Sequence, residues 1–318
     1  DAIFNERETI NIGSGEYGEV KKATYLPDNI ENSAIKIMNL GHVPQRENYI
    51  RSIQDRISRI RQFNSRFITK YYSRMDVRDG YLLHFGMEYC RDNLKKYTEK
   101  QRNAIDIGQI YDILFQLNKA FQIMKDNDIV HGNIKLENIL VNPAGGDKYE
   151  FKLSGFETIP ELIRLTKEKR PENICKYLPP EILKESKRNF NIDSSMDLWS
   201  VGLIIYYLCF NSFPYNGESA HEVLADIQNK KLEKTNFYEL DDLISGLLNP
   251  EKSERFNWNQ YLRHPFFNDD GFWKKYNIDS EIGRGQISIV YKAINKNSRK
   301  NVAIKVIDFK KIDELLLN

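Results

Sequence analysis

The stretch that decides the fold is IVHGNIKLENILVN, from Ile129 to Asn142. It follows a segment, Ile107 to Lys125, in which apolar residues recur at the helical period. The amide of Asn133 can hold a hydroxyl group by a hydrogen bond, but it cannot take up a proton near neutral pH. The stretch therefore raises the question of whether the chain is an enzyme or keeps an enzyme's fold for another purpose.

The composition is that of a globular protein. The chain has 318 residues, of which 41% are hydrophobic, enough for a large core and two lobes. Its 47 basic and 45 acidic residues nearly cancel, so we expect neither nucleic acid nor a membrane as the main partner. The cysteines Cys90, Cys175 and Cys209 form no CxxC pair, and no secretion signal or membrane-length apolar run occurs. We therefore expect an intracellular, cytoplasmic location.

Upstream of the loop, residues 1 to about 90 have the pattern of a small β-rich lobe. Residues 8–26, ETINIGSGEYGEVKKATYL, predict a glycine-rich hairpin, and SAIKIMNL at 33–40 predicts a third strand. Isoleucines at helical spacing predict one helix from about Arg46 to Phe63. Two further strands are expected at 67–76 and 81–90. Beyond Arg91 the pattern becomes helical.

The glycine-rich hairpin carries a recognisable motif. Gly13, Gly15, Gly18 and Val20 match G-x-G-x-x-G-x-V, in which the glycines let backbone amides approach phosphate oxygens. Lys36, in SAIK, stands where a strand lysine can reach the α- and β-phosphates. Each signal is weak alone, since glycine-rich hairpins and solvated strand lysines are common.

Further motifs follow in a fixed order: GMEYC at 86–90, VHGNIKLEN at 130–138, KLSGFE at 152–157, YLPPEIL at 177–183, DLWSVGLIIYYL at 197–208 and PEKSERF at 250–256. This ordered series resembles the eukaryotic protein kinase family from about residue 7 to residue 268. With Lys135 two residues after Asn133, the loop resembles that of serine/threonine kinases and not that of tyrosine kinases. The resemblance implies an α+β, two-lobed fold, with a β-rich N-lobe at about 1–90 and a helical C-lobe at about 91–268. It also implies that Arg255 pairs with Glu181, beside Asp197 and Trp199.

The resemblance also implies a nucleotide site between the lobes. GMEYC resembles the adenine-binding hinge, and Val20, Ala34 and Leu140 would sandwich the base. The residues expected to enclose ATP are Gly13, Gly15, Gly18, Val20, Ala34, Lys36, Met87, Glu88, Tyr89, Cys90 and Leu140.

The chain departs from the family at the residues that carry the chemistry. In H-R-D-x-x-x-x-N the aspartate accepts the proton of the substrate hydroxyl, and here His131, Gly132, Asn133 and Asn138 fill the pattern. Gly132 removes the arginine that would grip a phosphorylated activation loop. His131 is expected to be structural.

The metal-binding loop departs as well. Gly155 stands at the position of the metal-binding aspartate, so Asn138 is a partial metal site, and Mg²⁺ binding should be weak or absent. Glu157 is expected to be a solvated surface acid, with contact to a cation from an altered backbone as the alternative.

The helix expected at 46–63 bears on the partner of Lys36. Active kinases pair this lysine with an inward-facing helix glutamate, but Asp55 falls opposite the isoleucines and Glu47 is too close in sequence. The bridge is therefore expected to be absent or rebuilt. Four arginines are expected on the solvated face, with a docking surface for an acidic or phosphorylated partner as the alternative: Arg51, Arg56, Arg59 and Arg61.

The chain contains one internal repeat. IGSGEYGEVKKA at 12–23 returns as IGRGQISIVYKA at 282–293, and SAIKIM returns as VAIKVI. Residues 271–318 therefore resemble the incomplete start of a second kinase-like N-lobe, with Ser288 at the third glycine. The corresponding nucleotide-site residues are Gly283, Gly285, Val290, Ala303 and Lys305.

The functional expectation is a pseudokinase that regulates or scaffolds, binding ATP, the adjacent kinase-like domain and other proteins. One alternative is a weakly active serine/threonine kinase in which Asn133 only orients the substrate. The other is a nucleotide-free scaffold in a larger assembly. The basic segment RLTKEKRPE at 164–172 is expected to be a mobile loop, with a recognition strip as the alternative.

Overall fold

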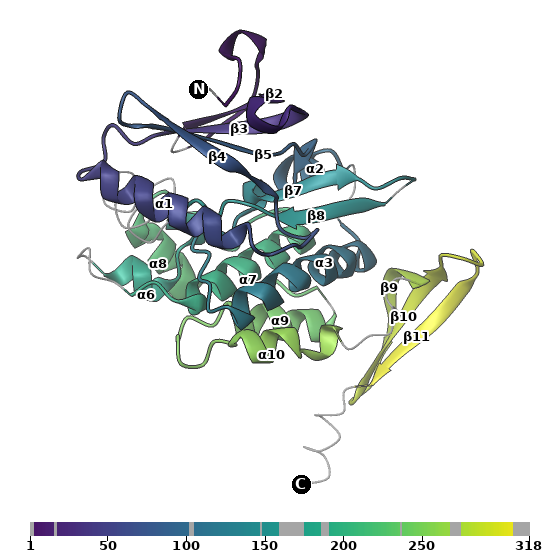
Figure 1. Cartoon of the computed structure of the whole chain (residues 1–318). Coiled ribbons are helices and arrows are strands. Elements are labelled where there is room, and N and C mark those ends of the chain that lie inside the picture. The colour runs from purple at the N-terminus through teal and green to yellow at the C-terminus, as the bar shows by residue number, and fades with distance from the viewer. Residues whose placement is uncertain are drawn as a thin grey trace.

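The computed structural model describes residues 3–15, 18–101, 105–146, 148–158, 175–185, 191–235, 237–267 and 275–307. Two lobes stand one above the other in Figure 1, a strand-rich lobe and a larger helical lobe. The α+β, two-lobed prediction is confirmed. The basic segment at 164–172 lies outside the described residues, as do the expected junction at 268–271 and the chain beyond residue 307.

The N-lobe is an antiparallel sheet with one helix against it. Its strands are ordered β1-β2-β3-β5-β4. Their bounds are β1 (Ile10–Gly15), β2 (Gly18–Tyr25), β3 (Ile30–Asn39), β4 (Tyr71–Arg78) and β5 (Leu82–Glu88). Gly18 approaches the neighbouring strand so closely that a Cβ atom there would lie 1.8 Å from the Ile37 carbonyl oxygen. Only glycine therefore fits where the hairpin enters β2.

The helix of this lobe, α1 (Arg46–Ile60), buries the isoleucine stripe that predicted it. Ile50, Ile53, Ile57 and Ile60 are all buried, whereas Asp55 is exposed on the other side. The prediction that Asp55 does not face Lys36 is thus confirmed.

The C-lobe is built around one helix that is buried on nearly every side, α7 (Ser194–Phe210), with Trp199 fully enclosed. Around it lie α2 (Leu94–Glu99), α3 (Ile107–Asp126), α6 (Pro180–Lys184), α8 (Ala220–Asn229), α9 (Tyr238–Leu247) and α10 (Trp258–Leu262). A small sheet, ordered β6-β7-β8, faces the N-lobe: β6 (Asp92–Asn93), β7 (Ile139–Pro143) and β8 (Tyr149–Leu153).

Arg255 and Glu181 form an ion pair within this lobe. Arg255 Nη1 and Nη2 donate to the two Glu181 carboxylate oxygens at 2.7 and 2.8 Å, and the guanidinium also lies 4.9 Å from the Trp199 ring. This predicted pair is confirmed. A paired, bidentate geometry is what allows the charge of Arg255 to be buried.

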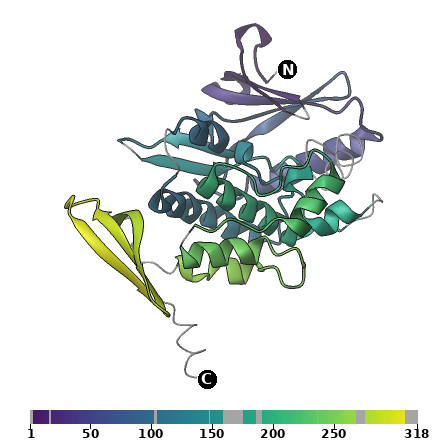
Figure 2. The same ribbon diagram turned by 180° about the vertical axis from the view of Figure 1, so that it is seen from behind.

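A second antiparallel sheet lies beside the helical lobe and appears in yellow in Figures 1 and 2. It is ordered β11-β10-β9: β9 (Tyr276–Arg284), β10 (Ser288–Asn295) and β11 (Asn301–Ile307). In the first sheet Val20 pairs with Gly13 and Lys36, and in this sheet Val290 pairs with Gly283 and Lys305. The repeat in sequence is therefore also a repeat in strand register.

Candidate functional site

The loop that begins at Ile129 is held in place by one buried carboxylate. The two oxygens of Asp197, on α7, accept the backbone N–H groups of His131 and Gly132, each at 2.7 Å. Gly132 has φ 73°, a left-handed conformation that glycine adopts without strain. The residue that replaces the family's arginine thus also suits the local backbone.

His131 supports the loop from inside. Its Nδ1 accepts the backbone N–H of Asn133 at 3.1 Å, so its Nε2 carries the proton that it shares with the Ser154 carbonyl oxygen at 2.9 Å. Burial, and secondly repulsion by Arg56, lower the pKa of His131 to about 3. The ring is therefore neutral near pH 7, with both nitrogens engaged by the protein.

Asn133 and Asn138 are hydrogen-bonded to the protein. Asn133 Nδ2 donates to the Thr158 hydroxyl at 2.7 Å, and Asn138 Nδ2 donates to the Asn133 carbonyl oxygen at 2.7 Å. These bonds fix the relation between the loop and the segment after β8. The Asn133 amide is occupied by Thr158 and offers no group that can take up a proton.

Gly155 is more than a missing carboxylate, because another side chain fills its surroundings. Its φ is 91°, and a Cβ atom there would lie 2.5 Å from Asn138 Nδ2 and 2.7 Å from Asn138 Cγ. An aspartate could not enter this position unless Asn138 moved and the backbone accepted strain. A larger side chain at position 155 would therefore compete with Asn138 for this space.

Glu157 is buried, and the prediction of a solvated surface acid is wrong. Its side chain is 1% exposed, one oxygen pairs with the Lys36 ammonium, and the other accepts the Tyr71 hydroxyl at 2.8 Å. The expectation failed because the backbone after β8 directs Glu157 back beneath the N-lobe sheet, where β3 and β4 supply a cation and a donor. The bridge to Lys36 is therefore rebuilt, from a different part of the chain.

The ionisation of this cluster follows from its contacts. Burial alone would raise the pKa of the Glu157 carboxyl, but attraction to Lys36 and the hydrogen bonds that it accepts bring that pKa below its ordinary value. Burial, and secondly the charge of Glu157, raise the pKa of Tyr71 well above its ordinary value. Near pH 7 the Glu157 carboxyl is therefore ionised and the Tyr71 phenol is neutral.

Arg56 corrects another expectation, that it lies on a solvated face together with Arg51, Arg59 and Arg61. Its Nε donates to the Phe156 carbonyl oxygen at 2.5 Å, and its Nη2 donates to those of Val130 at 2.6 Å and His131 at 3.3 Å. Burial lowers the pKa of Arg56, yet guanidinium groups stay charged in proteins. These hydrogen bonds hold the Arg56 side chain toward the interior and connect α1 to the loop that begins at Ile129.

The residues expected to hold a base share one face of the N-lobe sheet. Val20 pairs with Lys36, and Ala34 pairs with both Lys22 and Met87, which places Val20, Ala34, Lys36 and Met87 on the side toward the C-lobe. Leu140 is half-buried on β7. The N-lobe sheet thus places Val20, Ala34, Lys36 and Met87 on one face, whereas Leu140 belongs to the small sheet of the C-lobe.

The hinge segment makes contacts of its own. Glu88 binds the Lys152 ammonium at 2.8 Å, Tyr89 lies beneath the Lys22 ammonium, and Cys90 Sγ accepts from Asn142. Burial raises the pKa of the Cys90 thiol to about 12. These side chains face the protein, so a base would meet the hinge mainly through its backbone.

The remaining expected residues lie apart from this cluster. Within the described part of the glycine-rich hairpin, a Cβ atom at Gly13 or Gly15 would meet nothing within 4 Å. Lys135 is half-buried before a short 3₁₀ helix (Leu136–Asn138). Of the residues of the second copy, Gly283, Val290, Ala303 and Lys305 lie on the strands of the separate sheet β9 to β11, and Gly285 lies in the turn between β9 and β10.

Residues 7–267 match the protein kinase domain family, and the chain belongs to this family. It is 26% identical over 262 residues to the membrane-associated tyrosine- and threonine-specific cdc2-inhibitory kinase of Drosophila melanogaster, covering 80% of this chain and 45% of that protein. It is 24% identical over 272 residues to serine/threonine-protein kinase ATG1b of Arabidopsis thaliana, covering 81% and 36%. The chain therefore spans less than half the length of these two relatives.

A third relative is covered more fully. Testis-specific serine/threonine-protein kinase 1 of Mus musculus is 27% identical over 269 residues, which are 80% of this chain and 70% of that protein. Among the described residues, no helix combines the length and apolar character needed to cross a membrane.

Proposed function

We propose that residues 1–268 form a pseudokinase, a protein kinase domain that regulates or scaffolds without transferring phosphate. The observation that carries this proposal is the arrangement around Gly155. The position of the metal-binding carboxylate is a glycine, and the Asn138 side chain occupies the adjacent space. Positioning and charge neutralisation by Mg²⁺ supply most of the catalysis of phosphoryl transfer.

The residues do not fit a bound Mg²⁺ in the usual way. Mg²⁺ prefers oxygen ligands in a near-octahedral arrangement. The nearest acid in sequence, Glu157, is 1% exposed and uses both oxygens on Lys36 and Tyr71. The Asn138 amide donates through Nδ2 to the Asn133 carbonyl oxygen, so Asn138 could offer a cation only its Oδ1 atom, and Gly155 offers no second side-chain oxygen.

A nucleotide without its metal fits the remaining residues better. Val20, Ala34 and Met87 form an apolar face for a base, and Lys36 keeps a carboxylate partner that holds its ammonium at the cleft. The side chain of Lys36 is 20% exposed, whereas that of its partner Glu157 is 1% exposed, so Lys36 is the member of the pair that a phosphate could approach. We therefore propose ATP binding with little dependence on Mg²⁺.

The proposed mode of action is through surfaces and through nucleotide-dependent stiffening. The repeated register of β9 to β11 supports an adjacent kinase-like segment as one partner. Other protein partners would meet the exposed face of α1 or the helical lobe. The weakly active kinase and the nucleotide-free scaffold remain as outcomes of the tests.

Thermal unfolding of the whole chain with ATP, with ATP and Mg²⁺, and with Mg²⁺ alone tests the proposal. A ligand at a hundred times its dissociation constant stabilises the folded state by about 2.7 kcal/mol. The proposal predicts a similar rise of the midpoint with and without Mg²⁺, lost in Lys36→Met. A rise that requires Mg²⁺ would contradict it, and no rise in any condition would leave the scaffold.

A further inference from the structure

The two faces of the sheet β9–β11 differ in burial. Side chains of alternate residues point to opposite faces of a strand. On one face Tyr291, Ala293 and Ile304 are 3%, 0% and 7% exposed. On the other face Ala303 and Lys305 are exposed. This sheet is therefore covered on one side only.

The helical lobe provides the cover. The ring of Tyr291 stacks on that of Phe237, at the N-terminal end of α9, with centroids 5.2 Å apart and planes at 22°. At one end of the sheet, the Lys296 ammonium lies 3.6 Å from the carboxylate of Asp106, which caps α3. Tyr291, Ala293 and Ile304 belong to the same hydrophobic cluster as the C-lobe core.

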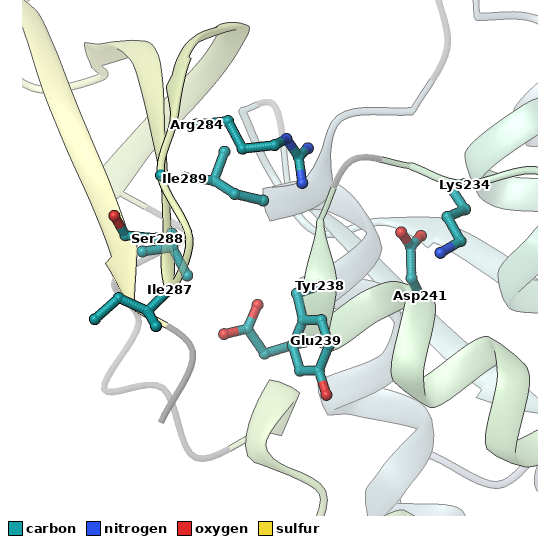
Figure 3. Close-up of a pocket in the computed structure, with 10 residues that line it drawn as sticks. Lys234, Tyr238, Glu239, Asp241, Arg284, Ile287, Ser288 and Ile289 are labelled. Atoms are coloured by element: carbon teal, nitrogen blue, oxygen red, sulfur yellow. The ribbon is translucent and has the colours of Figure 1, made fainter. Parts of the chain in front are cut away.

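The glycine-rich hairpin of this sheet also faces α9. A cavity of about 320 Å³ separates the two, lined by Tyr238, Glu239 and Asp241 on one side and by Arg284 and Ser288 among others on the other. Figure 3 shows Arg284 and Ile289 pointing from the sheet toward the helical lobe, and Glu239 pointing back toward the sheet. The hairpin thus faces the helical lobe across this cavity, which side chains of both parts line.

Comparison with the first copy identifies which face is covered. The register makes Ala293 and Ile304 equivalent to Ala23 and Ile35, which lie on the outer face of the N-lobe sheet. There they are covered by Ile3, Phe4 and other residues of the same lobe. In the second sheet the C-lobe takes over this covering role.

The opposite face is the one that carries the nucleotide-site residues of the first copy. Val290, Ala303 and Lys305 are equivalent to Val20, Ala34 and Lys36. Ile307, at the end of β11, is 42% exposed, whereas its equivalent Met38 is fully buried in the N-lobe. The face that would meet a nucleotide is thus turned away from the helical lobe.

We propose that the end of the C-lobe formed by the starts of α3 and α9, with Asp106 and Phe237, is a docking surface for the sheet β9–β11. We call this docking surface the seat. It contacts the outer face of that sheet and leaves Val290, Ala303 and Lys305 on the face that points away from the helical lobe. This inference rests on the tandem arrangement in the proposed function and specifies its contact surface. The pseudokinase domain would then contact its neighbour on the face opposite the nucleotide-site residues. It would act on that neighbour by setting the position of its glycine-rich hairpin.

Hydrogen exchange on the whole chain, followed by mass spectrometry, tests the seat with two matched substitutions. Ala293→Glu places a charge on the covered face, and Ala303→Glu places the same charge on the open face of the adjacent strand. We expect the β10 amides to exchange at least tenfold faster in Ala293→Glu and within twofold of the unchanged chain in Ala303→Glu. The α7 amides, an internal reference, should keep their rates in both variants.

A reciprocal variant, Phe237→Ala, removes the ring on the helical side without altering the sheet. It should also accelerate β10 exchange at least tenfold, whereas Phe213→Ala, whose ring contacts Tyr177 and Tyr207 instead, should not. Equal effects of the two alanine substitutions, or unchanged β10 exchange in Phe237→Ala, would overturn the seat. The readout involves no nucleotide or phosphate transfer, so it can fail while the pseudokinase proposal stands, and the reverse.

Discussion

Lys36 forms an ion pair with the buried carboxylate of Glu157, although the two residues lie 121 positions apart in the chain. The lysine comes from β3 and the glutamate from the segment after β8, beside the glycine that stands at the metal-binding position. In the family the lysine's carboxylate partner comes from the helix that corresponds to α1. Here α1 contributes Arg56 instead, which binds carbonyl oxygens of the loop. Lys36 thus keeps a carboxylate partner, which comes from the segment after β8 and not from α1.

Substitution of Glu157 should destabilise the fold. Glu157→Gln removes the charge that compensates Lys36 in a buried setting, so we expect a loss of about 2 to 3 kcal/mol in the free energy of unfolding. Denaturant titration measures it. The control is Glu47→Gln, since Glu47 and Arg51 form an exposed pair at 3.9 Å that should contribute less than about 0.5 kcal/mol. Equal effects of the two substitutions would contradict the role of the cluster.

The contribution of Glu157 should depend on pH with a defined sign. Because its pKa is lower in the folded chain than in the unfolded chain, its stabilisation is complete above the ordinary carboxyl pKa of about 4.3 and is lost as the pH falls through the lower folded value. The difference in stability between the unchanged chain and Glu157→Gln should therefore shrink below about pH 4.3. A difference that stays constant down to the acid transition would count against the ion pair.

Two other buried groups also titrate under acidic conditions, and one of them responds to the charge of Glu157. Burial lowers the pKa of His131 to about 3 and raises the pKa of Asp197 to about 7. Both residues are present in both proteins. Loss of the Glu157 charge lowers the pKa of His131 further, so the comparison also contains the altered titration of His131, whereas the charges that act on Asp197 stay the same.

Gly155 should resist any side chain. Gly155→Ala adds a Cβ atom 2.5 Å from Asn138 Nδ2 at a positive φ, and we expect a loss of about 2 kcal/mol or more. Gly13→Ala, where a Cβ atom meets nothing within 4 Å, is the matched control and should change stability by less than about 1 kcal/mol. Thermal unfolding compares the two.

The same position allows a test of the steric argument. Combining Gly155→Ala with Asn138→Ala removes the close contact, so the double variant should lose less stability than the sum of the single variants. Strict additivity would mean that Asn138 does not fill the space beside residue 155.

Arg56 should matter more than any neighbouring arginine on α1. Arg56→Ala leaves three carbonyl oxygens without this donor and detaches α1 from the loop, at an expected cost of about 2 kcal/mol. Arg51→Ala, on the exposed face, should cost less than about 0.5 kcal/mol. Hydrogen exchange should show faster exchange in α1 for Arg56→Ala alone, and similar effects of the two would contradict the tie.

The fold was predictable because its signals are local. The isoleucine stripe of α1, the glycine hairpin before β2 and the order of short motifs each depend on neighbouring residues. Arg56 could have been placed as well: at about 100° per residue it lies only about 60° from Ile53, at the edge of the buried stripe. Polarity alone assigned it to solvent.

Glu157 could not have been placed in the same way. Its burial depends on where the chain turns after β8 and on Tyr71 and Lys36, which approach from strands far away in sequence. A sequence reports the absence of a carboxylate at position 155 but not that Asn138 fills the space. Contacts of this kind follow from the folded path and not from periodicity.

The central claim is that this kinase-family site does not transfer phosphate. Its most direct test is incorporation of label from γ-labelled ATP into the chain and into a generic serine/threonine substrate, with Mg²⁺ or Mn²⁺, for the unchanged chain and for Lys36→Met. The account predicts the same background incorporation for both proteins. Incorporation that is well above background and is abolished by Lys36→Met would contradict it and identify a working kinase.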